Sequence, residues 1–275
     1  MNALTMNKFG RRGLLSGAAA AVAALTLGGC ATRGADRVHY VLVHGAWHGA
    51  WCWSKLVPLL REQGHLVTAV DLPGRWQAPG QLTAIRAADF AATVGQVVQA
   101  SPFPVVLVGH SLGGATISLA AEQHPERIRR LVYLAAFLVP PGQSVGALAM
   151  GDKASRIPKA VRRDAATGVS VIAPEFAREV FYHDCSDDDV RMAVQLLSPE
   201  PPAMGGARLQ LTPERYGGVE RVYVECLQDR AISIGAQRSM QAAMPCRQVV
   251  TMDTSHSPFL SRPGELANVL SGLAG

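Results

Sequence analysis

The pentapeptide Gly109-His110-Ser111-Leu112-Gly113 decides the fold of this chain. It follows an apolar, β-branched run at 104–108 and precedes a helical segment that starts near Gly114. A G-x-S-x-G sequence between a strand and a helix is typical of a nucleophile elbow, a sharp turn that lifts the serine hydroxyl above a sheet. Glycines on both sides remove the Cβ atoms that would clash in that turn. We therefore predict that Ser111 is a nucleophile; the alternative is a glycine-rich turn with a solvated serine.

Outward from this turn, short apolar runs alternate with segments of helical periodicity. We predict strands at 38–43, 66–70, 104–108, 130–136, 221–226 and 248–252, and helices at 54–63, 82–99, 114–123, 236–243 and 265–273. Strands that alternate with helices form a parallel sheet with helices on both faces. The sequence therefore predicts an α/β fold with a mostly parallel central sheet.

The stretch from about 139 to 218 breaks this rhythm. It contains several prolines and amphipathic pieces, with no convincing strand alternation. Ser186 followed by three aspartates, 187–189, is typical of a helix N-cap with acids in the first turn; a metal site is the alternative. We predict that 139–218 is a helical lid inserted between two strands.

A serine hydroxyl needs a base to become a good nucleophile. In a fold with this elbow the order along the chain is nucleophile, acid, histidine. His256 lies in the loop after the last predicted strand, and Asp229 follows the strand at 221–226. We predict His256 as the general base and Asp229 as the acid that orients it. Glu225, inside the same strand, is the alternative acid.

An ester-cleaving site also needs donors for the oxyanion, usually two backbone N–H groups. We expect one from Leu112, after the nucleophile, and one from Ala46, in the loop after the first strand. His44 and His48 have the i, i+4 spacing of a metal pair, but the glycines between and after them argue against a helix there. We expect no metal and no cofactor.

The first 29 residues have the layout of an export signal. Lys8, Arg11 and Arg12 precede an apolar run at 14–27, which is shorter than the ~20 residues that span a bilayer. The adjacent arginines resemble a twin-arginine signal. Leu27-Gly28-Gly29-Cys30 resembles a bacterial lipobox, which implies an acylated Cys30 and a periplasmic or membrane-anchored lipoprotein. By resemblance to known lipoproteins, Ala31 after the cysteine favours the outer membrane. The alternative is a cytoplasmic enzyme with an apolar start.

This leader divides the chain into a signal at 1–29, a linker at 30–37 and one domain at 38–275. It also holds three of the basic residues behind the formal net charge of +5, so the mature chain carries +2. The remaining Lys and Arg are scattered, which excludes a nucleic-acid-binding stripe. Four further cysteines, at 52, 185, 226 and 246, lack C-x-x-C spacing, and we expect them to be mostly buried small apolar residues.

The stretch 41–53, Val-Leu-Val-His-Gly-Ala-Trp-His-Gly-Ala-Trp-Cys-Trp, resembles the plant methylesterase and hydroxynitrile lyase branch of the α/β-hydrolases and its bacterial esterase relatives. Segments 109–114, 135–137, 181–185, 229–232 and 255–261 are similar too. The resemblance covers most of 38–275 and is weakest in the lid. It implies the α/β-hydrolase fold and a carboxylesterase-type serine hydrolase that cleaves a small-molecule ester through an acyl-enzyme.

Two positions separate the reactions known in that branch. Its hydroxynitrile lyases carry a threonine where this chain has Gly45, and a lysine where it has Ser257; its methylesterases often have methionine at the latter position. The resemblance therefore implies an esterase, with a hydroxynitrile lyase-type C–C lyase or a non-catalytic small-ligand binder as alternatives. We expect Gly45, Trp47, His110 and Ser257 to contact the substrate. Apolar lid residues are expected either to line the pocket or to form the lid core: Val145, Leu148, Met150, Phe176, Val180 and Phe181.

Overall fold

The structure is a computed structural model that describes residues 37–75 and 77–275. The predicted export signal, the lipobox and Cys30 lie outside the described residues, so they stay predictions. Within the described part of the chain, no helix is both long enough and apolar enough to cross a membrane.

The described residues contain a six-stranded sheet with the order β2-β1-β3-β4-β7-β8, and all neighbouring strands are parallel. The strands are β1 His39–Val43, β2 Leu66–Val70, β3 Val105–His110, β4 Ile128–Leu134, β7 Arg221–Cys226 and β8 Gln248–Met252. This confirms the predicted α/β class and every predicted strand. Several ends differ by one or two residues: β3 continues to His110, β4 starts at Ile128, and β4 stops at Leu134, before Ala135 with its φ of 44°.

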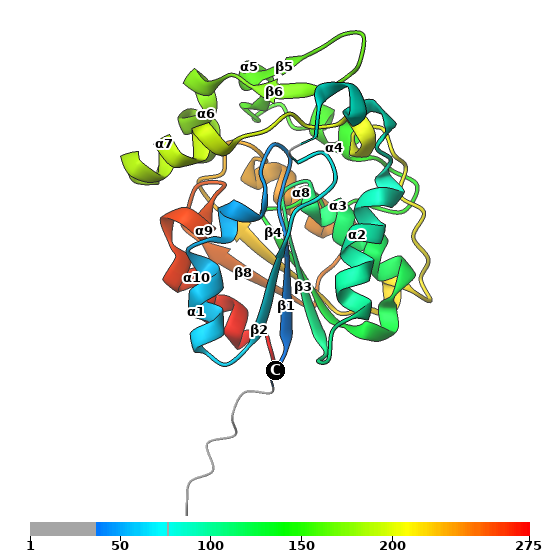
Figure 1. The fold of residues 1–275 in the computed structure, drawn as a ribbon. Helices are drawn as coiled ribbons and strands as arrows, with labels where there is room; N and C mark the ends of the chain where they lie inside the picture. The colour runs from blue at the N-terminus through cyan, green and yellow to red at the C-terminus, as the bar shows by residue number, and fades with distance from the viewer. Residues whose placement is uncertain (1–36, 76) are drawn as a thin grey trace, which may run out of the picture. The chain divides into compact units, whose positions relative to one another are not determined.

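Helices cover both faces of this sheet (Figure 1). They are α1 Leu56–Glu62, α2 Ala87–Gln99, α3 Gly113–Gln123, α8 Ile234–Ala243, α9 Pro258–Ser261 and α10 Pro263–Gly272, with short 3-10 turns η1 Ala50–Trp53, η2 Pro79–Ala84 and η3 Pro125–Arg127. Along β1, Tyr40 and Leu42 face the core on one side, which α1 and α10 cover. Val41 and Val43 face the core under α2 and α3. Burial on both faces explains why the strands are continuous apolar runs.

The prediction of a single helix over 82–99 is wrong for its first residues. The 3-10 turn η2 ends at Ala84, and Arg86 is extended, with φ −115° and ψ 159°. The Asp89 carboxylate accepts the Arg86 N–H at 2.8 Å and thereby starts α2 at Ala87. An acid in the first helical turn favours this start, and the apolar spacing alone did not reveal it.

Between β4 and β7 the chain forms the predicted lid region, which lies beyond the carboxyl ends of the strands (Figure 1). Its elements are α4 Val145–Gly151, α5 Ile157–Ala160, β5 Val161–Arg163, β6 Ser170–Ile172, α6 Pro174–Phe181, α7 Asp187–Leu196, η4 Pro202–Met204 and η5 Tyr216–Gly218. The Ser186 hydroxyl accepts the Asp189 N–H at 3.2 Å, which confirms the predicted N-cap. The antiparallel pair β5–β6 was not predicted, because three-residue strands are too short to show a period.

Candidate active site

The predicted elbow is present between β3 and α3. Ser111 adopts a φ of 54°, in the left-handed region that is disfavoured for residues with a Cβ. Such a conformation costs roughly 1–2 kcal/mol, and its neighbours hold it. Ser111 donates its N–H to the Leu134 carbonyl at 3.3 Å, and its carbonyl accepts N–H bonds from Gly114 and Phe137 at 3.1 and 3.0 Å.

Close backbone approach explains the flanking glycines. A Cβ on Gly109 would lie 2.7 Å from the Gly113 carbonyl oxygen, and a Cβ on Gly113 would lie 2.7 Å from the Val43 carbonyl oxygen. Neither neighbour is a flexible side chain, so a larger residue at 109 or 113 would displace the backbone. The turn that presents Ser111 therefore requires both glycines.

His256 and Asp229 form a buried pair. His256 Nδ1 lies 2.7 Å from Asp229 Oδ2, and the two side chains are 1% and 0% exposed. An ionised carboxylate is only an acceptor, so Nδ1 carries the proton and Nε2 keeps its lone pair. This is the tautomer in which the imidazole can accept a proton from a serine hydroxyl.

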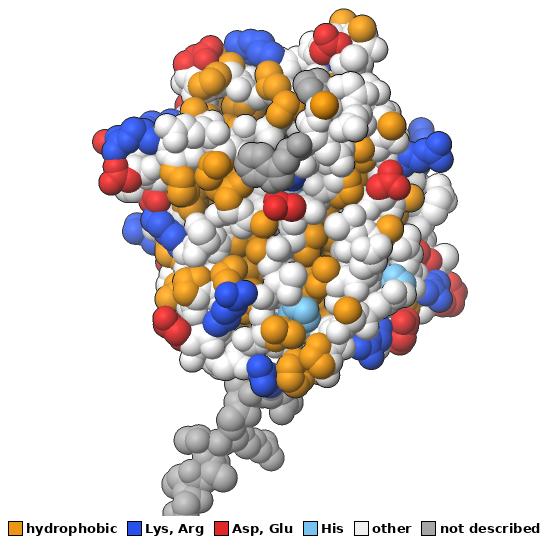
Figure 2. Space-filling view, viewed as in Figure 1, with side chains coloured by type: hydrophobic (Ala, Val, Ile, Leu, Met, Phe, Trp, Pro, Cys, Tyr) orange, Lys and Arg blue, Asp and Glu red, His pale blue; other side chains and the backbone are white. Residues whose placement is uncertain are grey.

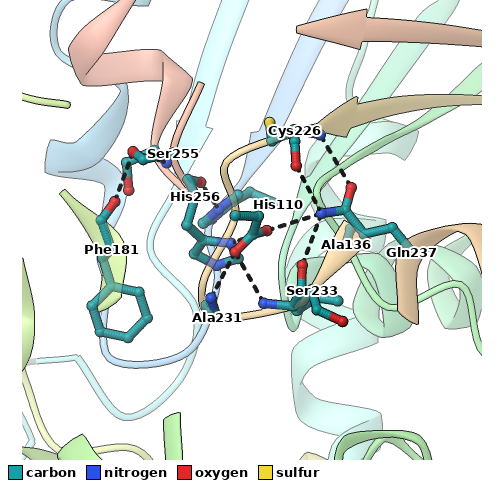
Figure 3. A network of polar contacts seen from close by, with 12 residues as sticks. His110, Ala136, Phe181, Cys226, Ala231, Ser233, Gln237, Ser255 and His256 are labelled. Carbon is teal, nitrogen blue, oxygen red and sulfur yellow. Dashed lines mark hydrogen bonds and ion pairs between the residues drawn. The ribbon is translucent and has the colours of Figure 1, made fainter. Parts of the chain in front are cut away.

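Three further donors fix the Asp229 carboxylate, and Figure 3 labels two of their residues, Ala231 and Gln237, beside His256. Oδ1 accepts the backbone N–H groups of Ala231 and Ile232 at 2.7 and 3.0 Å. Oδ2 accepts the Gln237 side-chain amide at 3.1 Å in addition to His256. A carboxylate held by several donors keeps one orientation, so it fixes the imidazole in turn.

Gln237 is a functional candidate that the sequence analysis missed. It lies in α8 and is completely buried. Its side-chain oxygen accepts the Cys226 N–H at 3.1 Å, and its nitrogen donates to the Ile232 carbonyl at 2.8 Å as well as to Asp229 (Figure 3). One amide thus joins the end of β7 to the loop that carries Asp229. Nothing in the local pattern distinguishes this glutamine from an exposed helical one.

Glu225, the alternative acid, has other partners. Its carboxylate accepts bonds from Arg238 at 2.9 Å and from the Thr251 hydroxyl at 3.0 Å, and it makes none with His256. The Arg238 hydrogen bond holds the pKa of Glu225 below its ordinary value. Glu225 therefore stays in an ion pair on β7, and Asp229 is the acid that reaches the histidine.

His256 and Ser111 lie at the same edge of the sheet. His110, next to Ser111, donates from Nε2 to the His256 carbonyl at 2.9 Å, and the two rings are tilted by 53° with centroids 4.4 Å apart. Among the described residues, no hydrogen bond joins the Ser111 hydroxyl to the imidazole. In unliganded enzymes this bond is often long and tightens when substrate binds.

The loop after β1 carries Ala46, the second predicted oxyanion donor. The backbone N–H groups of Ala46 and Leu112 have no acceptor among the described residues. His44 donates from Nδ1 to the Gly45 carbonyl at 2.8 Å, and its Nε2 accepts the Leu72 N–H at 3.1 Å. Since a backbone N–H is only a donor, the tautomer of His44 follows from this contact.

His48 holds the same loop from the other side. Its Nδ1 donates to the Ala46 carbonyl at 2.8 Å, and its Nε2 accepts the Tyr182 hydroxyl at 2.7 Å. Burial lowers the pKa of His44 and of His48 to about 3, so both rings are neutral at physiological pH. Within residues 37–75 and 77–275, no cluster of three or more His, Cys, Asp or Glu side chains is arranged to hold a metal.

A cavity of about 740 Å³ opens onto the elbow. Ser111, Leu112, Ala46 and Trp47 line it. Its lid wall is mainly apolar, and includes Val145, Leu148, Met150, Ile157, Pro158 and Val161. The six predicted lid side chains therefore divide into two groups. Val145, Leu148 and Met150 line the cavity, whereas Phe176, Val180 and Phe181 pack in the core.

Of the four predicted substrate contacts, only Trp47 lies in this cavity wall. Gly45, His110 and Ser257 are buried behind it. A Cβ on Gly45 would lie 2.6 Å from the Ser111 Cβ, so this glycine packs directly against the nucleophile. These three residues therefore support the site from behind, and the structure does not place them at the cavity surface.

Comparison with known proteins agrees with this geometry. The family described as Alpha/beta hydrolase family matches residues 40–269. Methylesterase 10 of Arabidopsis thaliana is 32% identical over 253 residues, which cover 86% of this chain and 91% of that protein.

Two crystal structures resemble the chain over nearly the same extent. Polyneuridine aldehyde esterase has a TM-score of 0.77 at 29% identity and covers 87% of this chain and 100% of its own. A pyrethroid hydrolase from Sphingobium faniae JZ-2 has a TM-score of 0.79 at 28% identity and covers 86% and 97%. The resemblance noted in the sequence is thus confirmed.

Proposed function

The chain belongs to the alpha/beta hydrolase family and is a small-molecule ester hydrolase, and we propose that it acts through Ser111, His256 and Asp229 on bulky, apolar carboxylic esters. The observation that carries the assignment of these residues is the buried His256–Asp229 pair at the same sheet edge as the strained Ser111 turn. The apolar cavity that opens onto Ser111 supports the substrate class.

The geometry supports an acyl-enzyme mechanism. Ser111 Oγ attacks the ester carbonyl while His256 Nε2 takes its proton, and the Asp229 carboxylate stabilises the imidazolium. The N–H groups of Ala46 and Leu112 bind the oxyanion of the tetrahedral intermediate. Collapse breaks the bond to the alcohol, which leaves with the proton from His256. Water, activated by the same imidazole, then hydrolyses the acyl-enzyme and restores Ser111.

Hydrolysis fits this site better than cyanide elimination. A cyanide leaving group needs a nearby cation, and the position after His256 is the neutral Ser257, whose side chain is completely buried. A threonine at position 45 would place its Cβ against the Ser111 Cβ. Release of cyanide from mandelonitrile above the uncatalysed rate would restore the lyase alternative.

The size and polarity of the cavity support the proposed substrate class. A volume of about 740 Å³ lies within the range of pockets that bury a drug-sized ligand. The surface of the cavity is mainly apolar, although Asp152, Lys153, Arg163 and Glu200 also line it, so we expect affinity to come mainly from buried apolar area. The similar proteins include methylesterases and a pyrethroid hydrolase. For this chain we propose a large apolar acyl or alcohol group.

Labelling and turnover test this proposal together. We expect a fluorophosphonate probe to label Ser111, and Ser111→Ala to abolish both labelling and hydrolysis of p-nitrophenyl esters while the circular dichroism spectrum stays unchanged. Full activity of Ser111→Ala would refute the nucleophile. A folded wild-type protein that neither reacts with the probe nor hydrolyses any ester in a panel would instead be a ligand binder.

We also propose that the enzyme is exported and anchored through an acylated Cys30. The basic residues, apolar run and lipobox-like sequence before Cys30 support this. Cells that express the full chain with radiolabelled palmitate should yield a labelled, membrane-associated protein, and Cys30→Ser should abolish the label. An unlabelled wild-type chain in the soluble fraction would contradict the anchor.

A further inference from the structure

A buried ion pair lies beside the loop that carries Ala46. Arg75 Nη2 is 2.5 Å from Glu200 Oε2, and the two side chains are 2% and 7% exposed. Arg75 follows β2, whereas Glu200 lies in the lid region between α7 and η4. Buried charges are costly unless they are paired, and a buried pair adds little stability compared with apolar residues. The pair therefore calls for a functional explanation.

The same carboxylate oxygen of Glu200 contacts the loop after β1, residues 44–48, which carries Ala46 and is called the oxyanion loop below. Glu200 Oε2 accepts the Trp47 backbone N–H at 2.9 Å. The backbone N–H of Ser198 donates to the Trp47 carbonyl at 2.9 Å, and Arg75 Nη1 donates to the Ser198 hydroxyl at 2.6 Å. The lid segment 198–200 thus holds both backbone polar groups of Trp47, and Arg75 holds that segment.

The backbone conformation of Trp47 explains why these hydrogen bonds from the lid are required. Its φ is 61°, in the left-handed region that a bulky residue rarely occupies. Without external hydrogen bonds the loop would relax towards a more favourable conformation. Residues in such conformations persist only where the surroundings impose them, and here the lid imposes it.

The two peptide groups around Ala46 are fixed as a result. His48 binds the Ala46 carbonyl and Glu200 binds the Trp47 N–H, so the peptide group between Ala46 and Trp47 is held at both ends. In the preceding group, His44 binds the Gly45 carbonyl. The Ala46 N–H is the one polar group of these two peptides without a partner in the described structure, as an oxyanion donor should be.

We infer that Glu200 is a positioning residue for the oxyanion loop, and that Arg75 neutralises its charge so that it does not repel the oxyanion. The lid would then assemble the catalytic site as well as enclose the substrate. This inference rests on the proposed roles of Ser111 and Ala46. Two other roles are open to test: Glu200 contacts the substrate, since it borders the cavity, or it only stabilises the fold.

Kinetics of Glu200→Ala on p-nitrophenyl butyrate distinguish these roles. A displacement of about 1 Å at a catalytic donor costs on the order of 10²-fold in rate. We expect kcat to fall by about this factor and the affinity for a trifluoromethyl ketone, which forms a tetrahedral oxyanion on the serine, to fall in parallel. We expect KM to change by less than about threefold, since binding of the ground state does not use the oxyanion donors.

Glu225→Gln is the matched control. Glu225 is also a buried carboxylate paired with an arginine, but it contacts no residue of the oxyanion loop. We expect its kcat and ketone affinity to stay within about threefold of wild type, even if its melting temperature falls. Thermal melts of all variants separate stability from rate.

A pair of variants tests the neutralising role of Arg75. Arg75→Met leaves a buried, unpaired carboxylate beside the loop. The double variant Arg75→Met/Glu200→Gln has no charge, yet its glutamine carbonyl can still accept the Trp47 N–H. We expect the kcat of the double variant to be at least about fivefold higher than that of Arg75→Met. The double variant also provides a folded test protein if Glu200→Ala does not fold.

Several results would overturn the inference. An increase in KM with kcat unchanged would make Glu200 a substrate contact, and a lower melting temperature with kcat unchanged would make it structural. A double variant no faster than Arg75→Met would exclude charge neutralisation. Failure of the proposed function is a separate result, because it appears in the wild-type protein as a Ser111 that no fluorophosphonate labels.

Discussion

Asp229 and Glu225 lie four positions apart, yet only one of them reaches His256. Glu225 is in β7, and its carboxylate is held by Arg238 on α8 and Thr251 on β8. Asp229 is in the loop beyond β7, where its carboxylate meets the imidazole. At the scale of single residues, the position relative to the end of the strand therefore decides which carboxylate contacts the histidine.

Substitution of the two acids should give opposite outcomes. Asp229→Asn preserves shape but provides a donor opposite His256 Nδ1, which favours the wrong tautomer, so we expect kcat to fall by about 10⁴-fold. Glu225→Gln should retain kcat within about threefold. Steady-state hydrolysis of p-nitrophenyl butyrate measures both, and a larger loss for Glu225→Gln would reverse the assignment.

At the scale of elements, α8 connects the sheet to the loop after β7 that carries Asp229, called the acid loop below. Ser233 caps the helix by accepting the Ala236 N–H at 3.2 Å, and one turn later Gln237 bonds to the end of β7 and to Asp229. The Asp152 carboxylate at the end of α4 also accepts the Ser233 N–H and hydroxyl at 2.8 and 2.7 Å. The lid and the acid loop thus meet at the start of α8.

Removal of the Gln237 amide should affect stability and rate together. Gln237→Leu leaves the Cys226 N–H without its partner, and a buried unsatisfied group costs roughly 1–3 kcal/mol. Because Asp229 loses one donor, we expect kcat to fall while KM is retained. Urea unfolding and kinetics measure the two effects. A Gln237→Leu variant with wild-type kcat would remove Gln237 from the site.

The lid helix α4 provides much of the apolar cavity wall, so it should set substrate size. Leu148 lines the cavity and is half-buried. We expect Leu148→Phe to lower kcat/KM for p-nitrophenyl octanoate by about 10-fold, the effect of a small volume change in an apolar pocket. The acetate ester should be unaffected because it does not reach the wall. An equal loss on both esters would show a general defect instead.

At the scale of the whole molecule, the sheet separates two apolar cores, and neutral histidines are buried at its carboxyl edge. Lys and Arg side chains are scattered over the face in Figure 2 and do not gather into one basic patch. Three of the cysteines outside the leader are buried free thiols, and Cys246 is half-buried. This agrees with their predicted role as small apolar residues.

Buried histidines make the stability of the molecule depend on pH. Desolvation lowers the pKa of His44 and His48 from 6.5 to about 3 in the folded state. Between these values the unfolded chain binds protons that the folded chain does not, so stability decreases as pH falls from about 6.5 towards 3. The slope should reach about 1.4 kcal/mol per pH unit for each histidine. Urea unfolding at a series of pH values measures it.

A variant isolates the contribution of one ring. His48→Gln keeps a donor for the Ala46 carbonyl but does not titrate, so we expect its stability to depend less steeply on pH than that of wild type. An unchanged slope would show that His48 does not contribute. Glu200 has the opposite effect on stability. Burial raises the pKa of its carboxyl, so the folded chain binds this proton more readily than the unfolded chain, and the contribution of Glu200 to stability increases as pH falls.

The sequence by itself determined the class of the fold, the positions of the strands and the places of Ser111, Asp229 and His256. These features depend on local periodicity, on turn residues and on the order of elements along the chain. Parallel strands bring their carboxyl ends to one edge, so loops that are distant in sequence meet there. The break at Arg86 and the pair β5–β6 escaped because their signals are confined to a few residues.

Only the tertiary structure decided which polar residues support the site. Arg75 and Glu200 are 125 positions apart, and Gln237 resembles any helical glutamine in sequence. Likewise, it assigned Trp47 to the cavity wall and His110 and Ser257 to the interior. The physical reason is that burial of a polar group depends on a partner that the fold brings close: the lid region supplies it for Arg75, and the end of β7 with the loop after it supplies it for Gln237.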